Sequence, residues 1–190
     1  MAEKEEGLFA RLDPRRRAYR KKEKMVSDYV NGQLEAARKV DLSYGKIPQE
    51  KVPDMVLAGE MEKIRLTLEQ LDPRVFSQAV ETILSAETIY ILGIRSCAPL
   101  ASFLSFYLQQ IFPDVRLLGT NSSNEIFEQL LRIHARDVLI GISFPRYSMR
   151  VLKAMEFANS KNAHTISITD SVHSPMNLYS SCNLFARSDM

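Results

Sequence analysis

The sequence DVLIGISFPRYSMR, at residues 137–150, joins a short apolar run to a turn that contains two serines. The nearly all-apolar run at 138–142 is typical of a strand that is covered on both faces of a parallel sheet. A helical pattern of apolar residues begins at Met149. The turn between them is therefore predicted to lie at the carboxyl end of a strand, where open α/β sheets bind ligands.

Two features of this turn favour a negatively charged ligand. We expect Ser148 to cap the new helix, whose free N–H groups and positive dipole end attract an anion. Arg146 and Arg150 add positive charge at the same place. The turn therefore predicts a phosphate group as its ligand.

Strand and helix patterns alternate from residue 88 to the end of the sequence. We expect strands at 88–92, 115–118, 138–142, 165–169 and 183–187, helices at 99–112, 124–134 and 149–161, and a helical turn at 176–179. Strands that alternate with helices of this length form right-handed βαβ units. The predicted fold class is therefore α/β, with a doubly wound, parallel, five-stranded sheet.

The N-terminal part of the chain has a different composition from the rest. Residues 1–45 predict a basic helical arm, and residues 46–54, with two prolines and no periodicity, predict a linker. Two helical stripes of apolar residues follow, at 55–71 and 75–84, separated by an Asp-Pro pair that predicts a helix start. These stripes predict core packing or a dimer contact.

The overall composition is that of a globular protein, with 45% hydrophobic and 25% charged residues. The net charge of +2 does not require a nucleic-acid partner. Cys97 and Cys182 have neither the number of a disulfide framework nor the spacing of metal ligands. We therefore expect a cytoplasmic protein without a signal peptide, a membrane span, a metal or a cofactor.

Small polar residues follow four of the five predicted strands. The four turns are GIRSC at 93–97, GTNSSN at 119–124, SFPRYS at 143–148 and TDS at 169–171, and Gly93 stands where the backbone must turn tightly. Because the carboxyl ends of parallel strands meet at one edge, these groups should converge, and hydroxyls and amides suit a sugar phosphate. Neither G-x-G-x-x-G nor a P-loop lysine is present, which argues against a dinucleotide or a nucleoside triphosphate.

These motifs together resemble a known family. YILGIRS at 90–96, GTNSS at 119–123, IGISFPRYS at 140–148 and SITDS at 167–171 are similar to the sugar isomerase (SIS) domain, a flavodoxin-like fold that binds phosphosugars. The third turn and the lead-in at 68–93 resemble the effector domain of RpiR/MurR-type transcription regulators. The resemblance covers residues 55–190.

The resemblance implies where a ligand would bind. By position, Ser96, Ser143 and Ser148 would contact the phosphate, and Thr120 and Asn121 would be secondary contacts. Arg146 either pairs with the phosphate or is a surface charge. Family members usually have a serine- and glycine-rich third turn, whereas this chain has Phe-Pro-Arg-Tyr at 144–147, which affects the shape of the pocket.

The resemblance also implies a regulatory role. Members of the family carry an N-terminal helix-turn-helix domain of the RpiR type, and residues 12–30 resemble its first helix only. The helix that normally closes the SIS domain is missing after the last predicted strand. The expected function is therefore phosphosugar sensing, with DNA as a partner only if a complete helix-turn-helix is present. The many large apolar residues of the helices at 55–86 and 99–112 predict a homodimer or higher homo-oligomer.

Two other functions stay open at this point. A stand-alone aldose–ketose isomerase needs a base, usually Glu, and a group that opens the sugar ring, often His. Glu125 and Glu128 begin the second helix of the sheet domain, His173 follows the fourth strand, and His134 and His164 are more typical of structural or surface positions. We expect no catalytic residues and no enzyme activity. The third alternative is a vestigial dimerisation module that binds no sugar.

Overall fold

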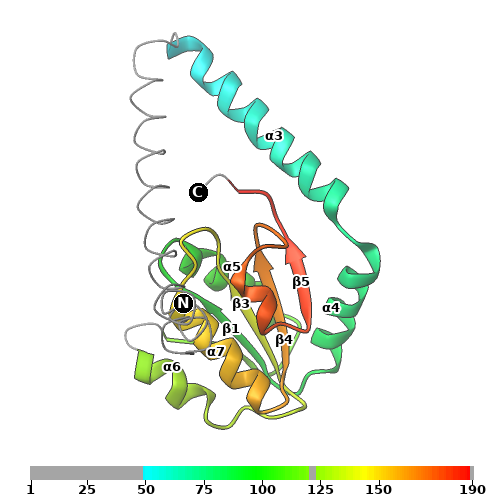
Figure 1. Ribbon diagram of the computed structural model, residues 1–190, viewed down its shortest axis with the longest axis vertical. Helices are drawn as coiled ribbons and strands as arrows, with labels where there is room; N and C mark the ends of the chain where they lie inside the picture. Colours follow the sequence, from blue (N-terminus) through cyan, green and yellow to red (C-terminus); the bar gives the residue numbers. More distant parts are fainter. Residues whose placement is uncertain (1–48, 120–122, 189–190) are drawn as a thin grey trace, which may run out of the picture. The chain divides into compact units, whose positions relative to one another are not determined.

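The computed structural model describes residues 49–119 and 123–188 (Figure 1). The basic arm predicted at 1–45 lies outside the described residues, and so do Thr120 and Asn121. The chain divides into two units after Val56, and the second unit, Leu57–Met190, contains the whole sheet.

Five parallel strands form a single sheet in the order β2-β1-β3-β4-β5. The strands are β1 (Ile89–Gly93), β2 (Val115–Leu117), β3 (Val138–Ile142), β4 (His164–Thr169) and β5 (Cys182–Phe185). The central strand β3 pairs along its whole length with β1 on one side and with β4 on the other. This strand order confirms the predicted doubly wound, flavodoxin-like sheet.

Helices cover both faces of this sheet (Figure 1). One face carries α4 (Pro73–Ser85) and α5 (Ala98–Gln109), and the other carries α6 (Ser123–Leu130), α7 (Met149–Ser160) and the 3-10 helix η3 (Pro175–Leu178). The 3-10 helix η2 (Arg95–Cys97) leads into α5, and η1 (Gln49–Lys51) leads into α3 (Val52–Gln70).

The strands β1 and β3 are apolar because both of their faces are buried. Ile89 and Ile91 of β1 pack in the cluster with α4 and α5, whereas Tyr90 and Leu92 pack in the cluster with α6 and α7. Every residue of β1 and β3 is buried. This alternation between two covered faces is the physical reason for the continuous apolar run that predicted β3.

The first long helix begins earlier than the sequence predicted. It begins at Val52, inside the predicted linker, because Pro53 is tolerated in the first helical turn, where its missing N–H costs no helix hydrogen bond. None of the described residues of α3 is buried, so its apolar stripe does not pack in the core of its own chain.

The helix after β2 is shorter than predicted. α6 ends at Leu130, although the sequence predicted a helix to residue 134. The backbone N–H groups of Ile133 and Asp137 each donate to a carbonyl three residues earlier, and these turns lead the chain into β3. Among the described helices, none combines the length and the hydrophobicity that a bilayer crossing requires.

Candidate functional site

The carboxyl ends of β1 and β3 lie next to each other, since Gly93 pairs with Ile142. From there the chain leaves β1 toward α5 on one face of the sheet and leaves β3 toward α7 on the other face. Open parallel sheets bind their ligands at such a switch point. We define the carboxyl-edge site as the turns 94–97 and 143–148, together with residues 169–174 after β4.

Gly93 is required in the first turn by a close approach of the backbone. A Cβ atom at this position would lie 2.4 Å from the carbonyl oxygen of Cys97 and 2.9 Å from the Cβ of Ala101. The turn and the start of α5 therefore pack directly on the end of β1. The residue that takes up the unusual backbone angle of this turn is Arg95, with a φ of 59°.

Arg95 and Arg146 share an unusual conformation at the two adjacent turns. The φ of Arg146 is 71°, so both arginines have a left-handed backbone conformation. For a residue other than glycine, this conformation costs roughly 1–2 kcal/mol of free energy. Both side chains are exposed, and neither forms a hydrogen bond or an ion pair with the described residues. Strained positions of this kind are concentrated at functional sites. The two charges are available for an anionic ligand.

The third turn is closed by a hydrogen bond between the two serines at its ends. The Ser148 N–H donates to the Oγ of the buried Ser143, at 3.1 Å. Ser148 is the N-cap residue of α7, but its hydroxyl forms no capping bond, so the predicted side-chain cap is wrong. The backbone carbonyl of Ser148 instead accepts from the Leu152 N–H, at 3.1 Å, and starts the helix. The half-buried Ser148 hydroxyl is left for other partners.

Tyr147 ties the third turn to the turn after β4. Its hydroxyl donates to the Oδ1 of Asp170, at 2.7 Å, and the Thr169 hydroxyl donates to the same oxygen at 3.2 Å. Burial, together with the bond to Asp170, raises the pKa of Tyr147 to about 12. Tyr147 is therefore protonated and acts as a donor at any physiological pH. Residue spacing gave no signal for this contact, because its two partners are 23 residues apart.

The remaining candidate residues are divided between the two edges of the sheet. Ser96 is exposed in η2, and Arg150 is exposed in the first turn of α7.

At the end of β2, a Cβ on Gly119 would lie 2.4 Å from the Oε1 of Glu125, so this carboxylate packs over the glycine. His173 is exposed in the loop after β4. His164 begins β4 at the opposite edge, away from the site.

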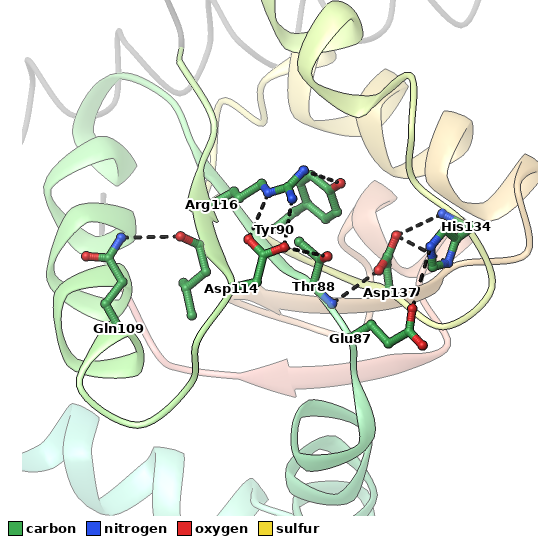
Figure 2. A network of polar contacts seen from close by, with 9 residues as sticks. Glu87, Thr88, Tyr90, Gln109, Asp114, Arg116, His134 and Asp137 are labelled. Carbon is green, nitrogen blue, oxygen red and sulfur yellow. Dashed lines mark hydrogen bonds and ion pairs between the residues drawn. The ribbon is translucent and has the colours of Figure 1, made fainter.

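Asp137 is the centre of a polar network at that opposite, amino-terminal edge (Figure 2). Its side chain is only 1% exposed, its Oδ1 accepts from the Thr88 N–H at 3.2 Å, and its Oδ2 accepts from the His134 N–H at 3.0 Å. The His134 ring lies between Asp137 and Glu87, and Glu87 also pairs with Arg136 at 2.9 Å. His134 is thus part of the scaffold, as its position in the sequence indicated.

The same network continues along the edge to β2 (Figure 2). Asp114 accepts from the Thr88 hydroxyl at 3.0 Å and pairs with Arg116 at 2.7 Å. The bond to Arg116 lowers the pKa of Asp114. Arg116 also donates to the hydroxyl of the buried Tyr90, at 3.2 Å. These groups form hydrogen bonds and ion pairs with one another and hold the strand starts together. The amino-terminal edge therefore has few polar groups left to bind a ligand.

Solved structures of similar fold come from a transcription factor domain, a ligand-complexed protein and an isomerase. The sugar isomerase domain of an RpiR transcription factor from Sphaerobacter thermophilus aligns with a TM-score of 0.69 and 27% identity, over 73% of this chain and 76% of that chain. The Vibrio vulnificus NanR protein complexed with ManNAc-6P aligns with a TM-score of 0.67 and 20% identity, over 80% and 56% of the two chains. A phosphoheptose isomerase from Francisella tularensis gives a TM-score of 0.66 at 18% identity, over 76% and 88%. The last two show similarity of fold alone.

Sequence comparison identifies the family. An uncharacterized HTH-type transcriptional regulator from Haemophilus influenzae is 27% identical over 123 residues, which are 65% of this chain and 41% of that relative. The chain thus spans less than half the length of this curated relative. The family model of the SIS domain matches residues 82–190, more than half of the chain. In agreement with its strand-end motifs and its strand order, the chain belongs to the SIS domain family.

Proposed function

We propose that this chain is a phosphosugar-sensing effector domain of an RpiR-type transcription regulator. One observation carries the proposal. At the switch point between β1 and β3, the exposed side chains of Arg95, Ser96 and Arg146 are engaged by no described residue, although two of them stand in strained backbone conformations. An anion at this place would make use of both charges.

The proposed ligand is a sugar phosphate. Its phosphate binds between the first and third turns, with Ser96, Ser143 and Ser148 as hydrogen-bond partners and Arg146 as the counter-ion. Thr120 and Asn121 are proposed as secondary contacts. The neutral hydroxyl groups of these turns suit sugar hydroxyls better than a second anion. The presence of ManNAc-6P in the NanR structure supports this class of ligand for the fold.

The connection of the two turns to both faces of the sheet supports a regulator role. The first turn leads into α5 on one face, and the third turn leads into α7 on the other, so one ligand joins elements of both layers. If the ligand changes the affinity for DNA in a complete regulator, DNA changes the affinity for the ligand by the same factor. The Haemophilus influenzae relative supports this role. We also propose a homodimer or higher homo-oligomer, located in the cytoplasm.

A phosphorus NMR titration of the purified chain with hexose and amino-sugar phosphates tests the proposal. We expect the phosphate line of one or a few sugars to broaden or shift, with no product line over several hours. Arg146→Ala should weaken this binding about tenfold, as expected for the loss of one charge-assisted contact of about 1.4 kcal/mol. Arg136→Ala removes the same charge at the amino-terminal edge and should leave binding unchanged. No response from folded protein to any sugar would contradict the proposal and favour the vestigial dimerisation module.

The same titration tests the isomerase alternative. One observation favours this alternative: the Glu125 carboxylate packs over Gly119 after the carboxyl end of β2, the strand beside β1, and a carboxylate can act as the base. A second phosphorus line that grows with time would show turnover. Glu125→Gln should then abolish the new line and keep the broadening, because the proposed phosphate contacts do not include Glu125.

A further inference from the structure

The exposed apolar stripe of α3 has the spacing of a coiled coil. Leu57, Met61, Ile64 and Leu68 are each between 62% and 70% exposed. They are separated by four, three and four residues, and Leu71 continues the series after three more. This is the d-a-d-a-d sequence of a heptad repeat, which forms a narrow seam along one side of a helix. The seam is therefore built to pack against another helix.

The opposite side of α3 is the one that contacts the rest of its own chain. The Thr67 hydroxyl oxygen accepts from the Arg187 N–H at 3.0 Å, and the Gln70 amide lies beside the Arg187 guanidinium. Leu66 is half-buried on this side, whereas every member of the seam up to Leu68 is exposed. Within the described residues, one side of α3 is therefore used for contacts inside the chain, and the apolar seam is exposed.

We infer that the seam binds the α3 helix of a second copy of this chain, in a parallel two-stranded coiled coil. With Met61 and Leu68 at a positions, Glu60 is at g and Arg65 is at e. In a parallel pair, the g residue of one helix meets the e residue five positions later on the other, so Glu60 of each helix faces Arg65 of the partner subunit. Both pairs join opposite charges.

The antiparallel arrangement lacks this complementarity. If Leu57 packed beside Leu68 of the partner subunit, Glu60 would lie near Thr67 and Arg65 near Ala58, so no opposite charges would meet. Arg65 already donates to Glu62 and Glu69 on its own helix, but a guanidinium has five N–H donors and keeps some for Glu60 of the partner subunit. Charge therefore selects the parallel pair.

The sequence predicted a homo-oligomer through several helices. The seam specifies one of these helices as the interface and one orientation of the two copies. In a parallel pair, both chains enter α3 at the same end, and the two-fold axis runs along the pair. The contact does not depend on sugar-phosphate binding, because α3 contributes no residue to the carboxyl-edge site.

Analytical ultracentrifugation tests whether the α3 seam forms the dimer interface. At tens of micromolar, the wild-type chain should sediment as a dimer of its 21.7 kDa protomer, and Ile64→Glu/Leu68→Glu should sediment as a monomer. The control is Leu131→Glu, which changes a leucine of similar exposure, 65%, outside α3 and should stay dimeric. Circular dichroism checks that the variants are folded. A monomeric wild type, or a double variant that stays dimeric through another surface such as the exposed aromatic side of α5, would overturn the inference.

Cysteine cross-linking tests the orientation. In the parallel pair, residue 57 lies beside residue 57 of the partner subunit, whereas in the antiparallel pair the two are eleven residues apart along the axis, or roughly 16 Å. Leu57→Cys should therefore form an intermolecular disulfide under mild oxidation. Gly59→Cys, whose Cβ would meet no atom within 4 Å and would point outward, should not. The wild type provides the baseline, since Cys97 and Cys182 are buried. Cross-linking at both positions or at neither would overturn the parallel pair.

A phosphorus titration of Ile64→Glu/Leu68→Glu separates this inference from the proposed function. A monomeric variant that still broadens the phosphate line supports both statements. If no sugar phosphate binds to the wild type while the dimer depends on the seam, the proposed function fails and the inference stands.

Discussion

The two edges of the sheet are made from the same strands but use their polar groups differently. At the amino-terminal edge, Asp137, Thr88 and Asp114 bond to one another or to neighbours, and Arg116 joins them to the buried Tyr90 (Figure 2). At the carboxyl edge, Arg95 and Arg146 form no such bonds with the described residues.

This difference separates stability from binding within one sheet. A polar group that is satisfied inside the protein stabilises the fold, and it would lose that bond if it turned to a ligand. A charged side chain held in a strained conformation without an internal partner adds no such stabilisation, and its charge remains for a ligand. Substitutions at the amino-terminal edge should therefore change the free energy of unfolding, and substitutions at the carboxyl edge should change ligand affinity.

The largest effect is expected at Asp137. Asp137→Ala removes the acceptor of the buried Thr88 N–H and of the part-buried His134 N–H, and should lower the free energy of unfolding by about 3 kcal/mol. Urea denaturation measures this loss. Glu87→Ala breaks exposed ion pairs at the same edge and should change the free energy of unfolding by no more than about 0.5 kcal/mol.

Loss of sugar-phosphate binding in a folded Asp137→Ala variant would contradict the assignment of stability to one edge and binding to the other. Asp137 lies at the start of β3, whereas the carboxyl-edge site begins after the end of this strand. A phosphorus titration of the variant, done below its unfolding temperature, should therefore give the same affinity as the wild type.

A smaller effect of opposite sign is expected at Arg146. Arg146→Gly removes the left-handed strain, and after the backbone entropy of glycine is subtracted it should raise the free energy of unfolding by roughly 0.5–1 kcal/mol. The same variant should lose about tenfold in sugar-phosphate affinity, because the counter-ion is gone. Arg146→Ala should lose the affinity without the gain in stability, since alanine is strained there as well.

Asn162→Gly is the matched control for the strain. Asn162 is also left-handed, with a φ of 58°, but it follows α7 at the other end of the helix from the site. Because asparagine tolerates this conformation better than arginine, its replacement should stabilise less and leave affinity unchanged. An equal gain at both positions would remove strain as a distinguishing feature of the site.

The architecture was largely predictable from the sequence, whereas the chemistry of the two edges was not. The run at 138–142 predicted β3 with the bounds that are observed, because burial on both faces leaves a continuous apolar signal. The bonds of Asp137 and Tyr147 leave no such signal, since their partners come from distant parts of the chain or from the backbone.

Two further features show what residue type and spacing leave undetermined. Ser148 was predicted to cap α7 from its residue type, but the cap depends on where its hydroxyl points, and the nearest bond is made by its N–H to Ser143. The apolar stripe of α3 has the same spacing as a core stripe, and spacing does not say whether the chain itself or another molecule covers it.

The last expected effect distinguishes two tyrosines, one at each edge. Burial raises the pKa of both, but Arg116 opposes the rise at Tyr90, whereas Asp170 reinforces it at Tyr147, to about 12. An unfolded tyrosine has a pKa of about 10, so the Tyr147 contribution to stability is complete below pH 10 and is lost as the pH rises toward 12. Since Tyr147 is partly exposed, we expect this contribution to be only about 1 kcal/mol.

Tyr147→Phe should therefore be less stable than the wild type by about 1 kcal/mol at pH 8, and the difference should shrink above pH 10. Urea denaturation at pH 8, 10 and 11.5 measures the difference, and absorbance at the tyrosinate band shows whether the last of the tyrosines to titrate is missing in the variant. Asp170→Asn is the control, because it keeps a hydrogen-bond acceptor and removes the negative charge, so it should lower the pKa of Tyr147 toward its ordinary value. If the last tyrosine to titrate persists in Tyr147→Phe, the charge beside each tyrosine does not distinguish the two edges.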